Sequence, residues 1–513
     1  MKRIFKNNLL HATVVFGSLL IVTVLSFNYN FFGFSEDNFY SGFQKDSESL
    51  VVNSIMADKF EIDKHNRGLG SFNGEACSIL PNTECTFFLT DQNWIKGVNR
   101  LLTTFFVQNE VKMRDAIHVG NKVKVNDSDE RTVLAIEQNG PYLKVKLSGE
   151  APLSKFVNTT PLEFKIDSDN SNNYQTLSSF VDKPTFSNYD SQYGIQGRFY
   201  SRISKALNVY SIKNLELFTA IVTGISIVLL TLSYARIFNG TYASIFFAVL
   251  VSSPWIISFA PNLYWIPFSW FLPALVTALL YESINSSFLV RIILLASYGL
   301  LILIKCLAGY EYLSSIILFS TSVFIVAPLF KGEKIKKIHI EFFIICSILS
   351  VLAFCLALAI HANMRADNLI DGLKIILDQD VKRRTYGNPA NFDPIYTSSL
   401  AASALSVVKT YILNWKTSIF FYLPGELFKI LISSIFFIFT FLVINGRLNA
   451  YSRNFIIIGI YSLIPISWFV LAKGHSHIHT HMNYVLWYLG FIPMIAYYFF
   501  YEIRDFTFRF LDK

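Results

Sequence analysis

The chain has 513 residues, of which 52% are hydrophobic and only 16% are charged. This composition is too apolar for a soluble protein of this length, and several runs are long enough to cross a bilayer. The formal net charge of +8 comes from basic residues that cluster in short loops between apolar runs. Such a distribution indicates membrane topology and argues against a nucleic-acid-binding surface. The five cysteines form no CxxC motif, so neither a zinc knuckle nor a dithiol redox site is indicated.

The first 27 residues combine a basic start with an apolar run. Lys2, Arg3 and Lys6 precede the run, which extends from about residue 9 to residue 27. A cleaved signal peptide is the alternative, but no small-residue cleavage site follows and the next residues are bulky and aromatic. We therefore expect a retained first transmembrane helix with a cytosolic N-terminus.

Residues 28–213 are polar and contain no run long enough to span a membrane, so we expect a separate periplasmic loop domain. Between about 115 and 167, alternating segments such as 121–125 and 142–147 are typical of short strands. Asn139-Gly140-Pro141 supply a turn signal between strand segments. We expect a small antiparallel β-rich insertion in this loop.

From residue 214 onward, apolar runs of about 20 residues dominate the sequence. The basic residues between them fall on the side of the N-terminus, in agreement with the positive-inside rule. We expect an all-α polytopic membrane protein with about ten transmembrane helices: helices 2–7 within 214–360, a second periplasmic loop at 361–426, and helices 8–10 with a short cytosolic C-terminus within 427–513. The nine candidate spans after the first are 215–235, 241–260, 263–282, 288–306, 311–330, 340–360, 427–445, 454–472 and 484–502.

Acidic residues shortly after the first span are candidates for catalysis. Asp46 and Glu48 form one pair, and Glu36 and Asp37 lie nearer to the end of the span. A carboxylate in this loop can take the proton from a hydroxyl group, which is general-base catalysis. The alternative is that these residues are solvated loop charges, and the sequence leaves open which pair would act.

Basic residues at the outward ends of apolar runs are candidates for binding an anion. Lys305 ends one run and Glu311 opens the next, so the two either form an ion pair that closes the hairpin or leave Lys305 to bind a lipid-linked phosphate. Arg365 and Arg383, in the second loop, can also bind a phosphate. Attraction to anionic lipid headgroups is the alternative for these arginines.

Histidines occupy alternate positions in 475–481, namely His475, His477, His479 and His481. This spacing places all four side chains on one face only if the segment is extended, and the HExxH zinc pattern is absent. We therefore favour imidazoles that hold a phosphate or a sugar hydroxyl over a metal site. No metal or cofactor is predicted, with a divalent metal ion left as the alternative.

Several common nucleotide and hydrolase motifs are missing from the sequence. It contains no P-loop, GxGxxG, GxSxG or protein-kinase motif set. It also lacks a large cytosolic domain that would bind a nucleotide sugar. A sugar donor used outside the cytosol would therefore have to be linked to a lipid.

Taken together, the chain resembles the GT-C class of integral-membrane glycosyltransferases, and more narrowly a group of bacterial multi-pass proteins from surface-polysaccharide gene clusters. The resemblance implies an inverting transfer of sugar from a polyprenyl-phosphate donor to a glycan acceptor, as in O-antigen and lipopolysaccharide biosynthesis. It implies a place in the bacterial inner membrane, with the large loops in the periplasm. The matching segments are Asp46-Ser47-Glu48, 57–59, 140–143, 191–197, 262–265, 271–273, 309–312 and 477–487.

The resemblance also implies roles for the candidate residues. Asp46 or Glu48 would be the catalytic base, although the family's paired-acid signature at the start of the loop is missing. The lipid bilayer and the two substrates are the expected partners, and a polysaccharide polymerase or a lipid-linked-glycan flippase or transporter is the alternative function. The candidates for the donor phosphate are Lys305, Arg365, Arg383, His475, His477 and His479, and those for the acceptor or sugar are Gln192, Tyr193, Gln196, Asn262, Tyr310 and Glu311.

Overall fold

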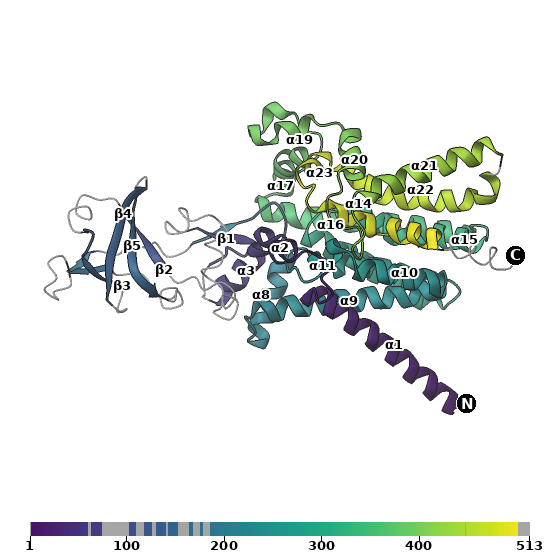
Figure 1. Cartoon of the computed structure of the whole chain (residues 1–513), viewed down its shortest axis with the longest axis horizontal. Helices are drawn as coiled ribbons and strands as arrows, with labels where there is room; N and C mark the ends of the chain where they lie inside the picture. Colours follow the sequence, from purple (N-terminus) through teal and green to yellow (C-terminus); the bar gives the residue numbers. More distant parts are fainter. Residues whose placement is uncertain are drawn as a thin grey trace. The chain divides into compact units, whose positions relative to one another are not determined.

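The computed structural model describes residues 2–59, 63–73, 102–108, 117–125, 130–139, 142–151, 164–167, 175–177, 185–446 and 448–500. The chain divides into two compact units. One comprises Met1–Phe43, Ser191–Tyr193 and Glu216–Lys513, and is called the helical unit below. The other comprises Gln44–Asp190 and Gly194–Leu215, and is called the loop unit. Each is described by itself (Figure 1).

The helical unit consists of long apolar helices joined by shorter helical segments. Short helices between α16 and α21 gather with α23 at one end of α16 and α22 (Figure 1). The elements are α1 (Lys2–Tyr29), α2 (Asp37–Gly42), α9 (Ile212–Ile237), α10 (Gly240–Val251), α11 (Pro254–Phe259), α12 (Phe268–Glu282), α13 (Phe288–Ala308), α14 (Leu313–Thr321), α15 (Val323–Lys331), α16 (Lys337–Arg365), α17 (Leu369–Ile375), η2 (Ile376–Val381), α18 (Lys382–Arg384), η3 (Pro389–Asn391), η4 (Pro394–Tyr396), α19 (Thr397–Ala401), α20 (Ala404–Leu413), α21 (Leu427–Ile444), α22 (Leu448–Leu471), α23 (Lys473–Ile478) and η5 (Asn483–Tyr488).

Five described helices are long and apolar enough to cross a membrane, and a sixth span results if α14 and α15 are counted together. The five are α9, α13, α16, α21 and the Tyr451–Leu471 part of α22. These helices confirm a mostly helical chain with the character of a multi-pass membrane protein. The count of ten stays a prediction, because Thr13–Tyr29, Gly240–Val251, Phe268–Glu282 and Phe491–Phe500 are shorter apolar helices.

Three of the predicted spans are broken in the structure, and one of them, 484–502, divides at Leu489-Gly490 between η5 and the helix Phe491–Phe500. The predicted span 241–260 divides into α10 and α11, where the side chain of Ser253 caps the backbone N–H of Ile256 and Pro254 takes the first helical position. Proline has no N–H to continue the preceding helix, but it suits a helix start. The predicted span 311–330 divides at Ser322 into α14 and α15, which are bent by 40°. Pattern and length alone do not reveal these breaks.

Buried hydrogen bonds join α12 to α14 and α13 to α16. The hydroxyl of Thr277 on α12 donates to the carbonyl of Ser320 on α14 over 2.6 Å. The hydroxyls of Tyr298 on α13 and Ser350 on α16 lie 2.8 Å apart. Both pairs are buried, where an unpaired polar group would be costly, so each holds its two helices in a defined position.

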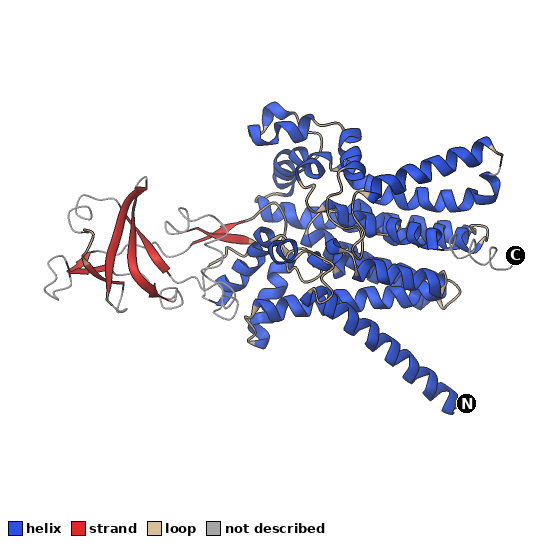
Figure 2. Ribbon diagram, in the orientation of Figure 1, coloured by secondary structure: helices blue, strands red, loops and turns tan. Residues whose placement is uncertain are grey.

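The loop unit contains two antiparallel sheets, drawn in red in Figure 2. All pairings are antiparallel, and the six-stranded sheet has the order β2-β5-β4-β3-β6-β7. Both alternating segments of the sequence lie in its strands, whereas Gly140-Pro141 lie outside the described residues. The strands are β1 (Gly70–Asn73) paired with β8 (Thr185–Asn188), and β2 (Leu102–Gln108), β3 (Lys122–Val125), β4 (Arg131–Asn139), β5 (Tyr142–Ala151), β6 (Phe164–Asp167) and β7 (Gln175–Leu177).

Two helices of the loop unit pack against each other, α3 (Lys45–Lys59) and α8 (Ile195–Leu207). Val52, Ile55 and Met56 of α3 and Tyr200 of α8 are fully buried. Burial of such side chains contributes about 1.5–3 kcal/mol each and is enough to hold the pair together.

Candidate functional site

A buried carboxylate lies at the turn between α13 and α14. Glu311 is 6% exposed, and its Oε1 accepts a hydrogen bond from Gln192 Nε2 over 2.7 Å. The same amide nitrogen donates to the hydroxyl of Tyr264 over 2.7 Å. Gln192 and Glu311, both predicted as ligands of the acceptor or sugar, therefore meet within the helical unit although 119 positions separate them in the chain.

The backbone at the end of α13 leaves room for the side chains of Gln192 and Glu311. Gly309 follows the helix in an extended conformation, and a Cβ there would lie 3.0 Å from Gln192 Oε1 and would collide with Glu311 Oε2. The Lys305 ammonium donates to the carbonyl of Gly309 over 2.6 Å. Glu311 attracts Lys305 electrostatically, but the ion pairs of the described residues do not include a direct contact between them. Lys305 therefore supports the backbone under the carboxylate.

Aromatic side chains pack around Tyr312, the residue that follows Glu311. Trp265 stacks on Tyr312 with ring centroids 5.4 Å apart, and Tyr312 donates to Asn483 Oδ1 over 2.8 Å. Trp468 contacts both Tyr312 and His475 edge-on, at 5.7 Å in each case. The indole N–H groups of Trp265 and Trp468 are buried and have no hydrogen-bond partner in the described part of the chain. Buried indole donors usually have a partner, so these two are available to a bound molecule.

Asp380 brings together the two arginines that were predicted for the donor phosphate. Its Oδ2 lies 3.3 Å from Arg365 and its Oδ1 lies 3.7 Å from Arg383. The side chains of Asp380 and Arg365 are only 6% and 10% exposed. Arg365 also donates to Gln379 Oε1 over 2.7 Å, and Arg383 lies over the ring of Tyr396. The single buried carboxylate thus holds two guanidinium groups in fixed positions.

The first part of the histidine segment is helical and not extended, so the four side chains do not share one face. His475 lies in α23 and His479 directly follows the helix, with their ring centroids 4.4 Å apart and those of His479 and His481 5.5 Å apart, while His477 is exposed. His475 is 7% exposed, and its Nδ1 has no hydrogen-bond partner among the described residues. Of the three histidines predicted for the phosphate, the structure brings together two.

The packing of α23 places this histidine pair beside the arginine-rich helix. A Cβ on Gly474 would lie 3.1 Å from the carbonyl oxygens of both Arg383 and Arg384, so the two backbones are in close contact. Burial lowers the pKa of His475 well below its usual value, and the nearby charges of His479 and Arg384 lower it further. His475 is therefore a neutral imidazole that can donate a hydrogen bond.

Tyr310 joins the carboxylate to the arginine group. Its hydroxyl lies 3.2 Å from His361 Nδ1, and it interacts electrostatically with Glu311, Asp380 and Arg384. Burial raises the pKa of Tyr310, so the phenol stays protonated and can donate. Glu311, Tyr310, His361 and Asp380 with the arginines and histidines around it, together with the neighbouring Trp265 and Trp468, are called the polar cluster below.

Three predicted residues of the helical unit lie outside the polar cluster or support it indirectly. Asn262 Oδ1 accepts from the backbone N–H groups of Tyr264 and Trp265, at 3.0 and 3.2 Å. It therefore shapes the loop that presents these two rings. Tyr193 is half-buried next to Gln192, and His477 is exposed.

The predicted catalytic pair belongs to the loop unit, as does Gln196. Asp46 is exposed on α3, while Glu48 is 1% exposed and accepts from Lys45 Nζ over 2.6 Å. Residues two positions apart on a helix do not share a face, so the two carboxylates cannot act side by side. The alternative acids, Glu36 and Asp37, lie in the helical unit and are exposed.

The sequence argument missed three members of the polar cluster, His361, Asp380 and Trp468. Asp380 carried a local signal, because it lies three residues before Arg383 and such spacing favours an ion pair on a helix. His361 precedes Arg365 by four residues and therefore shares its face of α16. Trp468 gave no signal beyond its place near the end of an apolar run.

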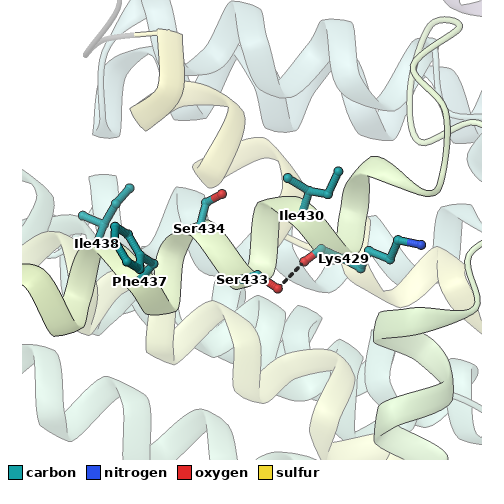
Figure 3. Close-up of a pocket in the computed structure, with 6 residues that line it drawn as sticks. All are labelled: Lys429, Ile430, Ser433, Ser434, Phe437 and Ile438. Atoms are coloured by element: carbon teal, nitrogen blue, oxygen red, sulfur yellow. Dashed lines mark hydrogen bonds between the residues drawn. The ribbon is translucent and has the colours of Figure 1, made fainter.

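A surface hollow on α21 does not belong to the site. Figure 3 shows its lining, in which Ser433 donates to the backbone carbonyl of Lys429 over 2.8 Å. Ile430 and Phe437 beside it are more than half exposed. Because α21 is a candidate span, this apolar face suits contact with lipid. Separately, the described residues contain no group of three or more His, Cys, Asp or Glu side chains that could hold a metal ion.

Comparison with protein-family models, curated proteins and solved structures finds no match for this chain. The resemblance to GT-C glycosyltransferases therefore rests on the sequence segments alone. The chemistry of the side chains in the polar cluster is therefore the basis for the function proposed below.

Acidification is expected to destabilise the fold through His475. Because folding lowers its pKa, the unfolded chain binds more protons below about pH 6.5, and the free energy of unfolding falls as the pH falls. One such group contributes about 1.4 kcal/mol per pH unit until its folded pKa is reached. Thermal unfolding of the detergent-solubilised chain between about pH 7.5 and pH 5 measures this slope. H475Q should flatten it, whereas H477Q, at the exposed position two residues away, should not; equal slopes in both variants would contradict the assignment.

Proposed function

We propose that the chain is a membrane glycosyltransferase of the GT-C type, which moves a sugar from a polyprenyl-phosphate donor to a glycan acceptor such as O-antigen. The reaction is proposed for the periplasmic face of a bacterial inner membrane. The observation that carries the proposal is the polar cluster, in which a buried carboxylate, unpaired aromatic N–H donors and a group of arginines and histidines lie together.

The arginine and histidine groups suit the phosphate of the donor. Arg383 is partly exposed and already oriented by Asp380 and Tyr396, so its guanidinium group can receive an oxygen ligand with little loss of side-chain freedom. Neutral His475 adds a hydrogen-bond donor without the cost of burying a further charge. Fixed cationic and dipolar groups of this kind stabilise the negative charge that develops on a leaving phosphate.

The aromatic groups and the carboxylate suit the sugar and the acceptor. The unpaired indole N–H groups of Trp265 and Trp468 can donate to the hydroxyls of the sugar, and the stack of Trp265 on Tyr312 fixes the position of one of them. In the proposed step the acceptor hydroxyl oxygen bonds to the anomeric carbon, and the bond from that carbon to the phosphate oxygen breaks. The bonding electron pair leaves with polyprenyl phosphate, and the hydroxyl proton passes to a carboxylate.

We assign the proton acceptor to Glu311, because it is a buried carboxylate in the unit that holds the cationic groups, whereas Asp380, the other buried carboxylate of the cluster, already pairs with Arg365 and Arg383. Gln192 holds one of its oxygens, and the other lies over Gly309. The role predicted for Asp46 or Glu48 stays an alternative. Of that pair, Asp46 is the accessible carboxylate, since Glu48 is buried against Lys45.

A lipid-linked-glycan flippase is the second candidate. The 40° break between α14 and α15 favours it, because discontinuous membrane helices commonly form the substrate sites of transporters. Against it, the described charged residues of the polar cluster lie near helix ends, whereas transport sites usually lie near the membrane midplane.

Deletion of the gene in its host, followed by mass spectrometry of the surface glycan, separates the two candidates. A transferase predicts that each repeat loses the mass of one sugar while the glycan still reaches the surface. Unchanged repeats that are missing from the surface, with accumulated lipid-linked precursor, would instead support the flippase or a polymerase and would remove the basis for the site assignments.

A further inference from the structure

The loop unit contains a hollow of about 480 Å³ that is separate from the polar cluster in the chain and rich in basic side chains. It is formed by the end of α3, the segment 63–67 and one face of α8. No residue of this hollow was predicted as a site residue. Its charged lining consists of Asp58, Asp63, Lys64, Arg67, Arg198, Arg202 and Lys205.

Close backbone contact fixes the wall that carries several of these side chains. A Cβ on Gly197 of α8 would collide with the carbonyl oxygen of Gly68, so the segment before β1 can approach α8 only because this position is glycine. Arg198, the next residue of α8, donates to Asn66 Oδ1 over 3.0 Å and to the Asn66 carbonyl over 2.6 Å. The segment and the helix therefore form a rigid wall.

Two more cations are held in place by partners inside the loop unit. Lys64 Nζ lies 2.8 Å from Asp58 Oδ1 and donates to Ser54 Oγ over 3.1 Å. Arg67 Nε lies 3.4 Å from Asp190 Oδ1. Ligand-binding cations that are already oriented lose less conformational entropy when an anion arrives.

Basic charge remains in excess after these pairs are counted. The lining holds five cationic and two acidic side chains, a formal charge of +3 by subtraction, which falls to +2 when Asp190, the partner of Arg67, is included. Arg202 and Lys205 are exposed, three positions apart on α8, and the hydrogen bonds and ion pairs of the described residues do not include either. Burial lowers the pKa of Lys64, although Asp58 raises it in part, and the charge of Arg198 also lowers it. Because cationic side chains are in excess, the hollow has a positive electrostatic potential, and a bound anion would lower it.

We propose that this hollow binds a multiply charged anion of the phosphate class, either a free phosphate compound or the phosphate of a lipid headgroup. Guanidinium groups match the geometry of phosphate oxygens, and the lysines supply further donors. A carboxylate carries a single charge and would leave part of the excess charge unbalanced. The proposal does not depend on sugar transfer by the polar cluster.

The test uses the full chain in a neutral detergent and the double variant R202A/K205A, whose positions are exposed and should not affect folding. Isothermal titration calorimetry with inorganic pyrophosphate measures the affinity for a free phosphate compound. Native mass spectrometry with phosphatidic acid, whose phosphomonoester can carry two charges, and with phosphatidylcholine as the neutral comparison counts the lipids that the protein retains. The matched control, K122A/K146A, removes the same charge from the sheet of the same unit.

We expect R202A/K205A to weaken the binding of at least one probe by about tenfold or more, since each lost charged hydrogen bond accounts for that order of change. The control should keep wild-type binding. Loss of pyrophosphate binding identifies a free phosphate site, and selective loss of phosphatidic acid identifies a headgroup site. Binding of both probes that is equal in the wild type and in R202A/K205A, or absent from both, would overturn the proposal.

Discussion

E311Q is expected to lower the rate of sugar transfer by about 100- to 10,000-fold, which is the usual contribution of a general base. The glutamine keeps an oxygen that can accept from Gln192 Nε2, so the local structure should be retained. What it loses is the ability to take the acceptor proton. The rate is measured with the purified chain and a polyprenyl-phosphate sugar, with thermal unfolding recorded for each variant.

The controls for this experiment are D46N and E48Q. Asp46 is exposed and its replacement should leave both transfer and stability near wild type. Glu48 is buried against Lys45, so E48Q should lower stability before it affects chemistry. Transfer that is lost in D46N and kept in E311Q would return the catalytic role to the first loop.

D380N is expected to lower the free energy of unfolding by about 3–5 kcal/mol, the usual cost of removing one partner from a buried ion pair. The asparagine keeps the shape of the side chain but leaves the guanidinium groups of Arg365 and Arg383 without their shared carboxylate. Arg365 is only 10% exposed, so water cannot replace the lost charge. Thermal or denaturant-induced unfolding in detergent measures the change.

Asp378 provides the matched control two residues earlier. It pairs with Lys382 over 2.6 Å, but both side chains are about half exposed. Exposed pairs contribute little to stability, so D378N should unfold close to the wild type. Equal destabilisation by D378N and D380N would show that any lost negative charge in this segment lowers stability equally. Asp380 would then have no special role in holding Arg365 and Arg383.

The membrane helices were largely predictable because each is encoded locally. A run such as 340–360 is apolar over enough residues to cross a bilayer, and α16 covers it in the structure. The breaks at Pro254 and Ser322 were missed, because a proline or serine inside an apolar run is compatible with either a straight or a broken span.

The alternating histidines show why a local pattern can mislead. Spacing of two suggested a common face on an extended segment, but α23 is helical and pairs His475 with His479 instead. The choice between the two conformations depends on packing, since Gly474 lies against the backbone of Arg383 and Arg384. That contact joins segments about 90 positions apart and leaves no trace in the local sequence.

The polar cluster was predictable as a set of candidates but not as an arrangement. Lys305, Tyr310 and Glu311 are neighbours in sequence, and their place at a helix turn follows from the apolar pattern. The contact of Glu311 with Gln192, and the bridge from Tyr310 toward Asp380, depend on the packing of distant segments. Asp46 and Glu48 attracted attention because they follow the first span, but their different burial depends on the packing of α3.

The most direct test of sugar transfer is mass spectrometry of an acceptor glycan incubated with the purified full chain and a panel of polyprenyl-phosphate sugars. The proposal predicts that one donor adds the mass of a single sugar to the acceptor and that free polyprenyl phosphate accumulates in equal amount. The opposite result is an unchanged acceptor with every donor, together with movement of intact lipid-linked glycan across vesicles that contain the chain. That result would contradict the transferase and select the flippase.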